Sequence, residues 1–89
     1  MKFEDARAQI IVAIDAATSI LSEPRFAGRI RDPEFDIEFA DLGLDSLAAM
    51  EICMELEEKA GIEIDLGDLA IHPSLNMLAR HVMETRAKG

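Results

Sequence analysis

The sequence predicts an all-α fold, a small four-helix bundle with three main helices, one short helix and a long first loop. Apolar residues recur at three- and four-residue steps in three separate stretches, the spacing of helices that bury one face. Pro and Gly residues interrupt the chain between these stretches. The length of 89 residues suits one domain, so we expect a single domain spanning residues 1–89.

The first predicted helix runs from Phe3 to Leu21. Its apolar stripe comprises Phe3, Ile10, Ile14, Ala17 and Leu21. Glu4 and Asp5 suit the positive end of its dipole. Pro24 and Gly28 then break the pattern, so the segment from Ser22 to Pro33 is predicted to be a loop.

The second predicted helix runs from Ser46 to Ala60. Its predicted buried stripe comprises Ala49, Ile52, Cys53, Leu56 and Ala60, reinforced by Leu47, Met50 and Met54. Asp45 or Ser46 can cap its start, because either side chain can accept from exposed backbone N–H groups. Gly61 tolerates the left-handed conformation that ends a helix.

Two more helices are predicted in the last third of the chain. Leu66 to Ile71 allows a short helix, since Pro73 disfavours helical dihedrals at His72. The final helix begins after Pro73 with Ser74 as its N-cap. Its apolar stripe comprises Leu75, Leu78, Ala79, Val82 and Met83.

Two segments alternate apolar and acidic residues instead. Phe35, Ile37 and Phe39 alternate in one, and Ile62, Ile64 and Leu66 in the other. Because two strands alone form a marginal sheet, we expect extended loops whose apolar side chains plug a helical core. An α+β fold is the alternative.

Charge is concentrated in the middle of the chain. Residues 32–68 carry thirteen acids and one base, a balance of −12, and the remainder carries five acids and eight bases, +3; together they give the net charge of −9. This charge disfavours nucleic acid and anionic membranes and favours basic partners. Glu51, Glu55 and Glu58 form one acidic ridge at helical spacing; a solvated helix face is the alternative interpretation.

The composition also bears on location and assembly. Cys53 is the single cysteine, which excludes an internal disulfide and suits a reducing compartment, so we expect a cytoplasmic protein. No apolar run approaches the ~20 residues of a membrane span, and no signal peptide is recognisable. Repulsion among the acids favours a monomer.

The residue patterns give no catalytic or metal site. From Asp32, a calcium loop would need Gly at its sixth position and Glu at its twelfth, but Ile37 and Gly43 stand there. His72 and His81 lack zinc-ligand spacing and are expected to pack or lie at the surface. Cys53 is expected to act as a small buried hydrophobe. An apolar lining of Ala49, Met50, Met54, Ile64, Ala70 and Met77 could open to shelter a guest chain.

Ser46 is the most informative polar residue. It has no nucleophile elbow around it, and no base–orienter pair is evident, so a catalytic role is disfavoured. A serine at a helix start is most often a cap. The same position suits a covalently attached phosphate, because unpaired N–H groups and the helix dipole stabilise negative charge there.

The run Phe39-Ala40-Asp41-Leu42-Gly43-Leu44-Asp45-Ser46-Leu47 resembles the phosphopantetheine attachment motif of acyl carrier proteins. The resemblance covers roughly residues 36–85. It implies a bundle of acyl carrier type and a 4′-phosphopantetheine group, donated from coenzyme A by a phosphopantetheinyl transferase, on Ser46, with Asp45 and Gly43 completing the motif. Such a protein carries acyl thioesters for fatty acid or polyketide synthesis and performs no chemistry itself.

The resemblance also implies partner contacts. Enzymes that load and process the acyl group would dock through basic patches on the acidic second helix, at Glu51, Glu55 and Glu58. Leu47 and Met50 are the expected apolar contacts. Ala48 after Ser46-Leu47 is nearer to polyketide carriers than to those of bacterial fatty acid synthesis. A peptidyl or aminoacyl carrier, an acidic interaction module without a prosthetic group, and a small hydrolase using Ser46 remain alternatives.

Overall fold

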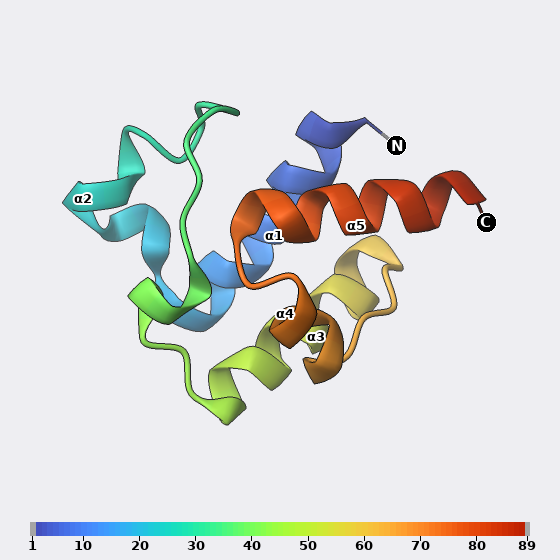
Figure 1. The fold of residues 1–89 in the computed structure, drawn as a ribbon. Coiled ribbons are helices and arrows are strands. Elements are labelled where there is room, and N and C mark those ends of the chain that lie inside the picture. Colours follow the sequence, from blue (N-terminus) through green and yellow to red (C-terminus); the bar gives the residue numbers. More distant parts are fainter. Residues whose placement is uncertain (1, 89) are drawn as a thin grey trace.

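The computed structural model describes the backbone of residues 2–88 and the side chains as far as Thr85. Its elements are α1 (Phe3–Thr18), η1 (Ile20–Ser22), α2 (Pro24–Ala27), η2 (Phe39–Leu42), α3 (Ser46–Ala60), α4 (Leu66–Ile71) and α5 (Leu75–Lys88). The described residues contain no strand (Figure 1). The predicted all-α fold is therefore confirmed, with three long helices and the expected short α4.

The core forms where α1 packs against both α3 and α5. Its fully buried large side chains come from every long helix and from two connecting segments: Ile10, Ile14, Ile20, Ile30, Ile52, Leu56, Leu75, Leu78 and Val82. The stripes predicted for the first and last helices supply most of these residues. Removing this apolar surface from water is the main stabilising force.

The first helix ends earlier than its apolar pattern predicts. It stops at Thr18, because Ser19 adopts a left-handed conformation with φ 58° and donates its N–H to the Asp15 carbonyl at 2.7 Å. The Asp15 carboxylate accepts from the Leu21 N–H at 2.9 Å, which fixes the following turn of 3₁₀ helix. The helix predicted to reach Leu21 is therefore three residues shorter.

The predicted loop from Ser22 to Pro33 is more structured than its composition indicated. Pro24 opens the one-turn helix α2, where its fixed φ and missing N–H are tolerated. Ile30 is fully buried further along. A single buried residue, Ile30, and a one-turn helix are too short to produce a periodic apolar pattern. Neither could therefore be predicted from the sequence.

Arg7 joins three parts of the chain from inside the protein. Although charged, it is only 3% exposed. Its guanidinium donates to Asn76 Oδ1 at 2.8 Å, and to the carbonyl oxygens of Ile30 and Phe35. Burial lowers the pKa of Arg7, and Asp36 and Asp32 partly oppose that shift. The network ties α1 and the 30–37 segment to the start of α5.

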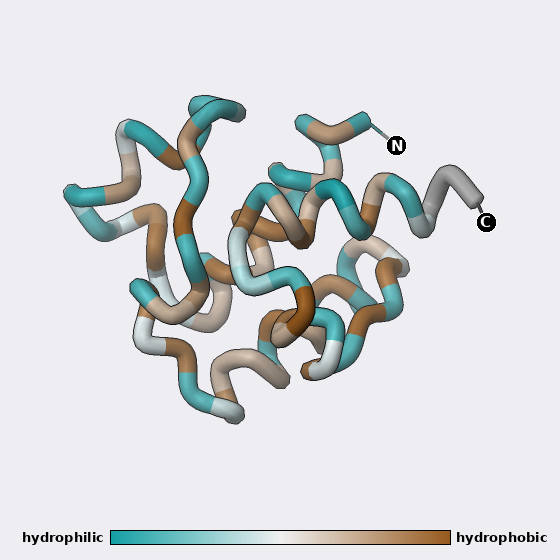
Figure 2. Tube along the Cα trace, viewed as in Figure 1, coloured by the Kyte–Doolittle hydropathy of each residue, from teal (hydrophilic) through white to brown (hydrophobic). Residues whose placement is uncertain are grey.

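The alternating segments are extended loops that place apolar side chains in the helical core, as predicted. Ile37 and Phe39 are buried, and Figure 2 shows hydrophobic and hydrophilic residues alternating along this stretch. Its only pairing is an isolated antiparallel bridge between Glu38 and Ser74. In the second segment Ile62 is buried, but Leu66 is 43% exposed. Leu66 begins α4, so its side chain departs from the alternating pattern.

No helix within residues 2–88 combines the length and the apolar composition needed to cross a membrane.

Candidate functional site

The turn before α3 is anchored on both sides of Gly43. Phe39 is buried at the start of η2, and Leu42 and Leu44 pack against the core. Between them Gly43 takes φ 63°, a left-handed conformation that disfavours any side chain, and its N–H donates to the Ala40 carbonyl at 3.2 Å. These apolar anchors fix the point where α3 begins.

Asp45, and not Ser46, caps α3. Its carboxylate accepts from the Ala48 N–H at 2.8 Å, and its carbonyl oxygen accepts from the Ala49 N–H at 3.0 Å. Ser46 is the first helical residue and is exposed. Its hydroxyl takes part in no hydrogen bond within the described part of the chain. The structure therefore removes the capping interpretation of Ser46 and leaves its hydroxyl accessible.

The three predicted ridge acids lie along α3. Glu51 and Glu58 are exposed and Glu55 is partly buried. The ion pairs among residues 2–85 join Arg25 to Glu23 and His81 to Asp68, and none neutralises the ridge. The ridge therefore keeps its negative charge without an ion-pair partner among the described residues.

Three apolar side chains predicted for the core of α3 lie outside it. Leu47 is 71% exposed, Met50 48% and Met54 55%. Ile52 and Leu56 fill the interface with α1, so residues on the adjacent helix face remain at the surface. Leu47 and Met50, the expected apolar partner contacts, are therefore both at the surface. The expected lining for a guest chain is wrong at Met50, Met54, Ala70 and Met77, all exposed.

The short helix α4 also exposes apolar side chains, which sequence reasoning missed. Asp65 and Asp68 form a reciprocal capping box at its start. Leu66 is 43% and Ile71 69% exposed at its two ends. The exposure of Ile71 could not be predicted, since a six-residue helix carries too few positions to define a face.

His72 and His81 meet although they lie nine positions apart in the sequence. Their rings stack with centroids 4.2 Å apart, and His81 Nε2 lies 3.6 Å from the Asp68 carboxylate. The expected packing role therefore has a specific form, joining α4 to α5. The residues that the structure describes contain no group of three or more His, Cys, Asp or Glu arranged to hold a metal ion.

Cys53 lies half-buried against the core, consistent with its predicted packing role. Burial raises the pKa of its thiol, and the negative charges of Asp65 and Asp68 raise it further. A thiol kept protonated is a poor nucleophile.

The family model described as the phosphopantetheine attachment site matches residues 26–82, well over half of the chain. The chain belongs to this family. Proteins of the phosphopantetheine attachment family hold 4′-phosphopantetheine covalently and act as carriers without catalysing reactions themselves, so this chain is a non-catalytic phosphopantetheine carrier.

Curated relatives of this carrier include polyketide synthases. It is 36% identical, over 80 aligned residues, to a subunit of the phenolphthiocerol/phthiocerol polyketide synthase of Mycobacterium tuberculosis; the alignment covers 79% of this chain and 4% of that protein. It is 53% identical over 34 residues to the non-reducing polyketide synthase stbA of Stachybotrys bisbyi, covering 38% of this chain and 2% of that protein. The carrier thus spans a few per cent of these relatives. No solved structure matches it significantly.

Proposed function

We propose that Ser46 bears the 4′-phosphopantetheine arm and that the chain presents acyl intermediates of polyketide assembly on it as thioesters. The observation that carries this proposal is that the cap of α3 and the exposed hydroxyl at its start belong to two different residues. Asp45 supplies the cap and Ser46 offers an exposed hydroxyl. Esterification of that hydroxyl would therefore cost the helix no hydrogen bond.

The start of α3 also fits the phosphate of the arm. The N–H groups of Ser46 and Leu47 make no hydrogen bond within the described residues, whereas those of Ala48 and Ala49 are used by Asp45. Unpaired N–H groups and the positive end of the helix dipole stabilise a phosphate on the first residue. The bound group would supply the thiol that carries the acyl chain, and Gly43 and Asp45 would hold its attachment residue outward.

Docking to the loading and processing enzymes is proposed to use the face of α3 beside Ser46. Glu51, Glu55 and Glu58 would attract basic patches, which speeds encounter and allows exchange among partners. Leu47 and Met50 would add apolar contact at the centre. The polyketide relatives support this pathway over fatty acid synthesis, and the single cysteine supports a cytoplasmic location.

Intact-protein mass spectrometry after incubation with coenzyme A and a broad-specificity phosphopantetheinyl transferase tests the proposal. We expect one added phosphopantetheinyl mass on the parent chain and none on Ser46→Ala. Ser22→Ala is a matched control that removes another exposed serine hydroxyl, retains Ser46 and should be modified fully. Addition to the Ser46→Ala variant would overturn the assignment of the attachment residue.

A second step addresses the cargo. The modified carrier should accept a malonyl group from a polyketide acyltransferase and no amino acid from an adenylating enzyme. The reverse pattern would favour the peptidyl or aminoacyl carrier. No modification of a folded parent chain by any transferase tried would favour the acidic interaction module.

A further inference from the structure

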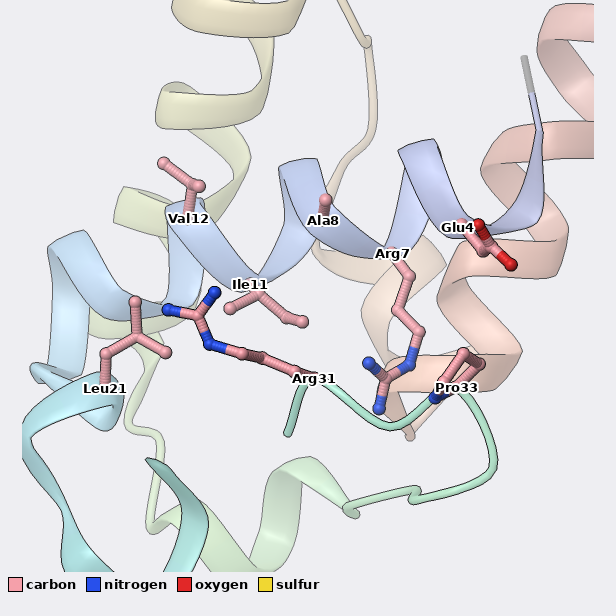
Figure 3. Close-up of a pocket in the computed structure, with 8 residues that line it drawn as sticks. All are labelled: Glu4, Arg7, Ala8, Ile11, Val12, Leu21, Arg31 and Pro33. Carbon is pink, nitrogen blue, oxygen red and sulfur yellow. The ribbon is translucent and has the colours of Figure 1, made fainter. Parts of the chain in front are cut away.

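A mainly apolar hollow among the described residues lies away from Ser46. It is an open-sided groove of about 420 Å³ between α1 and the segment that follows α2. Its lining comprises Glu4, Arg7, Ala8, Ile11, Val12, Leu21, Arg31 and Pro33 (Figure 3). Hollows of this size bind ligands in other proteins, and the proposed carrier function leaves it unused.

The floor of the groove is an apolar strip along one face of α1. Ala8, Ile11 and Val12 recur at helical spacing, beside the stripe that faces the core. Val12 is 55% exposed. Leu21 lies at one end of the groove, and Pro33 forms part of its wall toward the other end. Arg7 belongs to this wall, but its guanidinium is engaged by Ile30, Phe35 and Asn76.

The two ends of the groove carry opposite charges. Figure 3 shows the Arg31 side chain reaching past Ile11, with its guanidinium at the Leu21 end, whereas Glu4 stands at the other end. Both residues are exposed, and neither side chain is paired within the described part of the chain. An apolar strip with a cation at one end and an anion at the other is complementary to an elongated amphipathic ligand of opposite polarity.

We propose that this groove docks an amphipathic helix of a protein partner, with a carboxylate facing Arg31 and a cationic side chain facing Glu4. Val12 lies eight positions after Glu4 on α1, a rise of about 12 Å that a partner helix of two to three turns would match. A helix lying in an apolar groove is a recurring mode of recognition, anchored by apolar residues three and four apart.

The position of the groove allows it to be used together with the arm. Val12 also lines a small hollow with Glu55 and Lys59, which places it beside the C-terminal half of α3. Glu55 lies nine residues from Ser46, about 13 Å along the helix. A partner helix in the groove would leave the start of α3 accessible. One enzyme could then stay bound at the groove while the group on Ser46 reacts at another enzyme.

The test uses the full chain labelled with nitrogen-15 and a synthetic helical peptide of about 15 residues, long enough to hold helical structure. The peptide has a Leu stripe, one Glu near one end and one Lys near the other. We expect saturable amide shifts at Ala8, Val12 and Arg31. Arg31→Glu should weaken binding about five- to tenfold, and adding Glu4→Lys should restore it to within about twofold, because the peptide can then bind in the reverse direction.

Arg29→Glu is the matched control, since Arg29 is an exposed arginine of the same segment outside the groove. It should change the affinity less than about twofold. Val12→Asp should abolish binding, and the amide spectrum of each variant reports whether it is folded. Ser46→Ala should bind like the parent chain, which separates this proposal from the carrier function.

Three results would overturn the proposal. Equal losses for Arg29→Glu and Arg31→Glu would mean that the peptide responds only to general charge. Shifts at the groove with decanoate but none with the peptide would assign a small amphipathic acid as the occupant. Concentration-dependent sedimentation abolished by Val12→Asp would assign a second copy of the chain.

Discussion

Two halves of this carrier are stabilised in different ways. On one side the buried Arg7 guanidinium links α1, the 30–37 segment and α5 through hydrogen bonds that cross long stretches of sequence. On the other side α3 and α4 begin with local caps at Asp45 and Asp65 and expose apolar side chains such as Leu47 and Ile71. A long-range polar network therefore stabilises one side, whereas local caps stabilise the side on which Ser46 and the exposed apolar residues lie.

Replacing Arg7 should lower the stability of the protein more than any other proposed substitution, because it removes the whole buried network. Arg7→Met keeps much of the volume but leaves the carbonyl oxygens of Ile30 and Phe35 and the Asn76 amide oxygen without their donor. Unsatisfied buried groups of this kind lower the free energy of unfolding by about 3 kcal/mol, or Tm by roughly 12–24 °C. Urea and thermal unfolding measure both.

The matched control is Arg29→Met, which removes an exposed guanidinium with no partner among the described residues. Its free energy of unfolding should stay within about 0.5 kcal/mol of the parent value. Equal effects of the two substitutions would mean that overall charge, and not the Arg7 network, accounts for the loss.

Removing the cap of α3 should have a smaller and more local effect. Asp45→Ala loses the bond to the Ala48 N–H and should lower the free energy of unfolding by about 1 kcal/mol. Asp45→Asn keeps an accepting oxygen and should nearly restore it. Amide hydrogen exchange should become faster at Ala48 in Asp45→Ala and stay unchanged in the control Asp41→Ala; protection of Ala48 in Asp45→Ala would contradict the cap.

The smallest expected effect concerns Cys53. Because its pKa is raised in the folded protein, its thiol should be alkylated by iodoacetamide more slowly than in the urea-unfolded chain, with a pH profile displaced upward. The corresponding contribution to stability is fully present below the ordinary thiol pKa and is lost as the pH rises through the raised one. Cys53→Ser should remove that alkaline loss.

Asp65→Asn and Asp68→Asn should each move the alkylation profile of Cys53 back toward lower pH, because each removes a negative charge near the thiol. Glu51→Gln serves as the control, because it makes the same change of charge on α3 at a residue that does not contribute to the raised pKa of Cys53. A profile that responds equally to all three substitutions would argue against a local cause.

The sequence predicted local features well and long-range ones poorly. The candidate site could be found because Gly43, Asp45 and Ser46 are adjacent, and capping chemistry depends on neighbouring backbone groups. The buried network of Arg7 could not be predicted. Two of its acceptors are carbonyl oxygens, which any residue provides, and the third belongs to a residue 69 positions away. The surface position of Met54 was missed for a related reason: the apolar pattern cannot tell which side of a wide stripe a partner helix covers.

The bridge between Glu38 and Ser74 also has a consequence for how the fold can be divided. Phe39 donates its N–H to the Pro73 carbonyl at 2.8 Å, and Leu75 donates to the Ile37 carbonyl at 3.0 Å. Residues 37–39 and residues 73–75 therefore lie side by side, and the chain between them forms most of η2, all of α3 and all of α4. Residues 40–72 form a cassette with closely spaced ends, but its Ile52 and Leu56 are buried in the core that α3 shares with α1. Transplanting this cassette between homologous carriers would transfer Ser46 and the proposed docking face together, would require a recipient α1 that packs against Ile52 and Leu56, and would leave the α1 groove with the recipient.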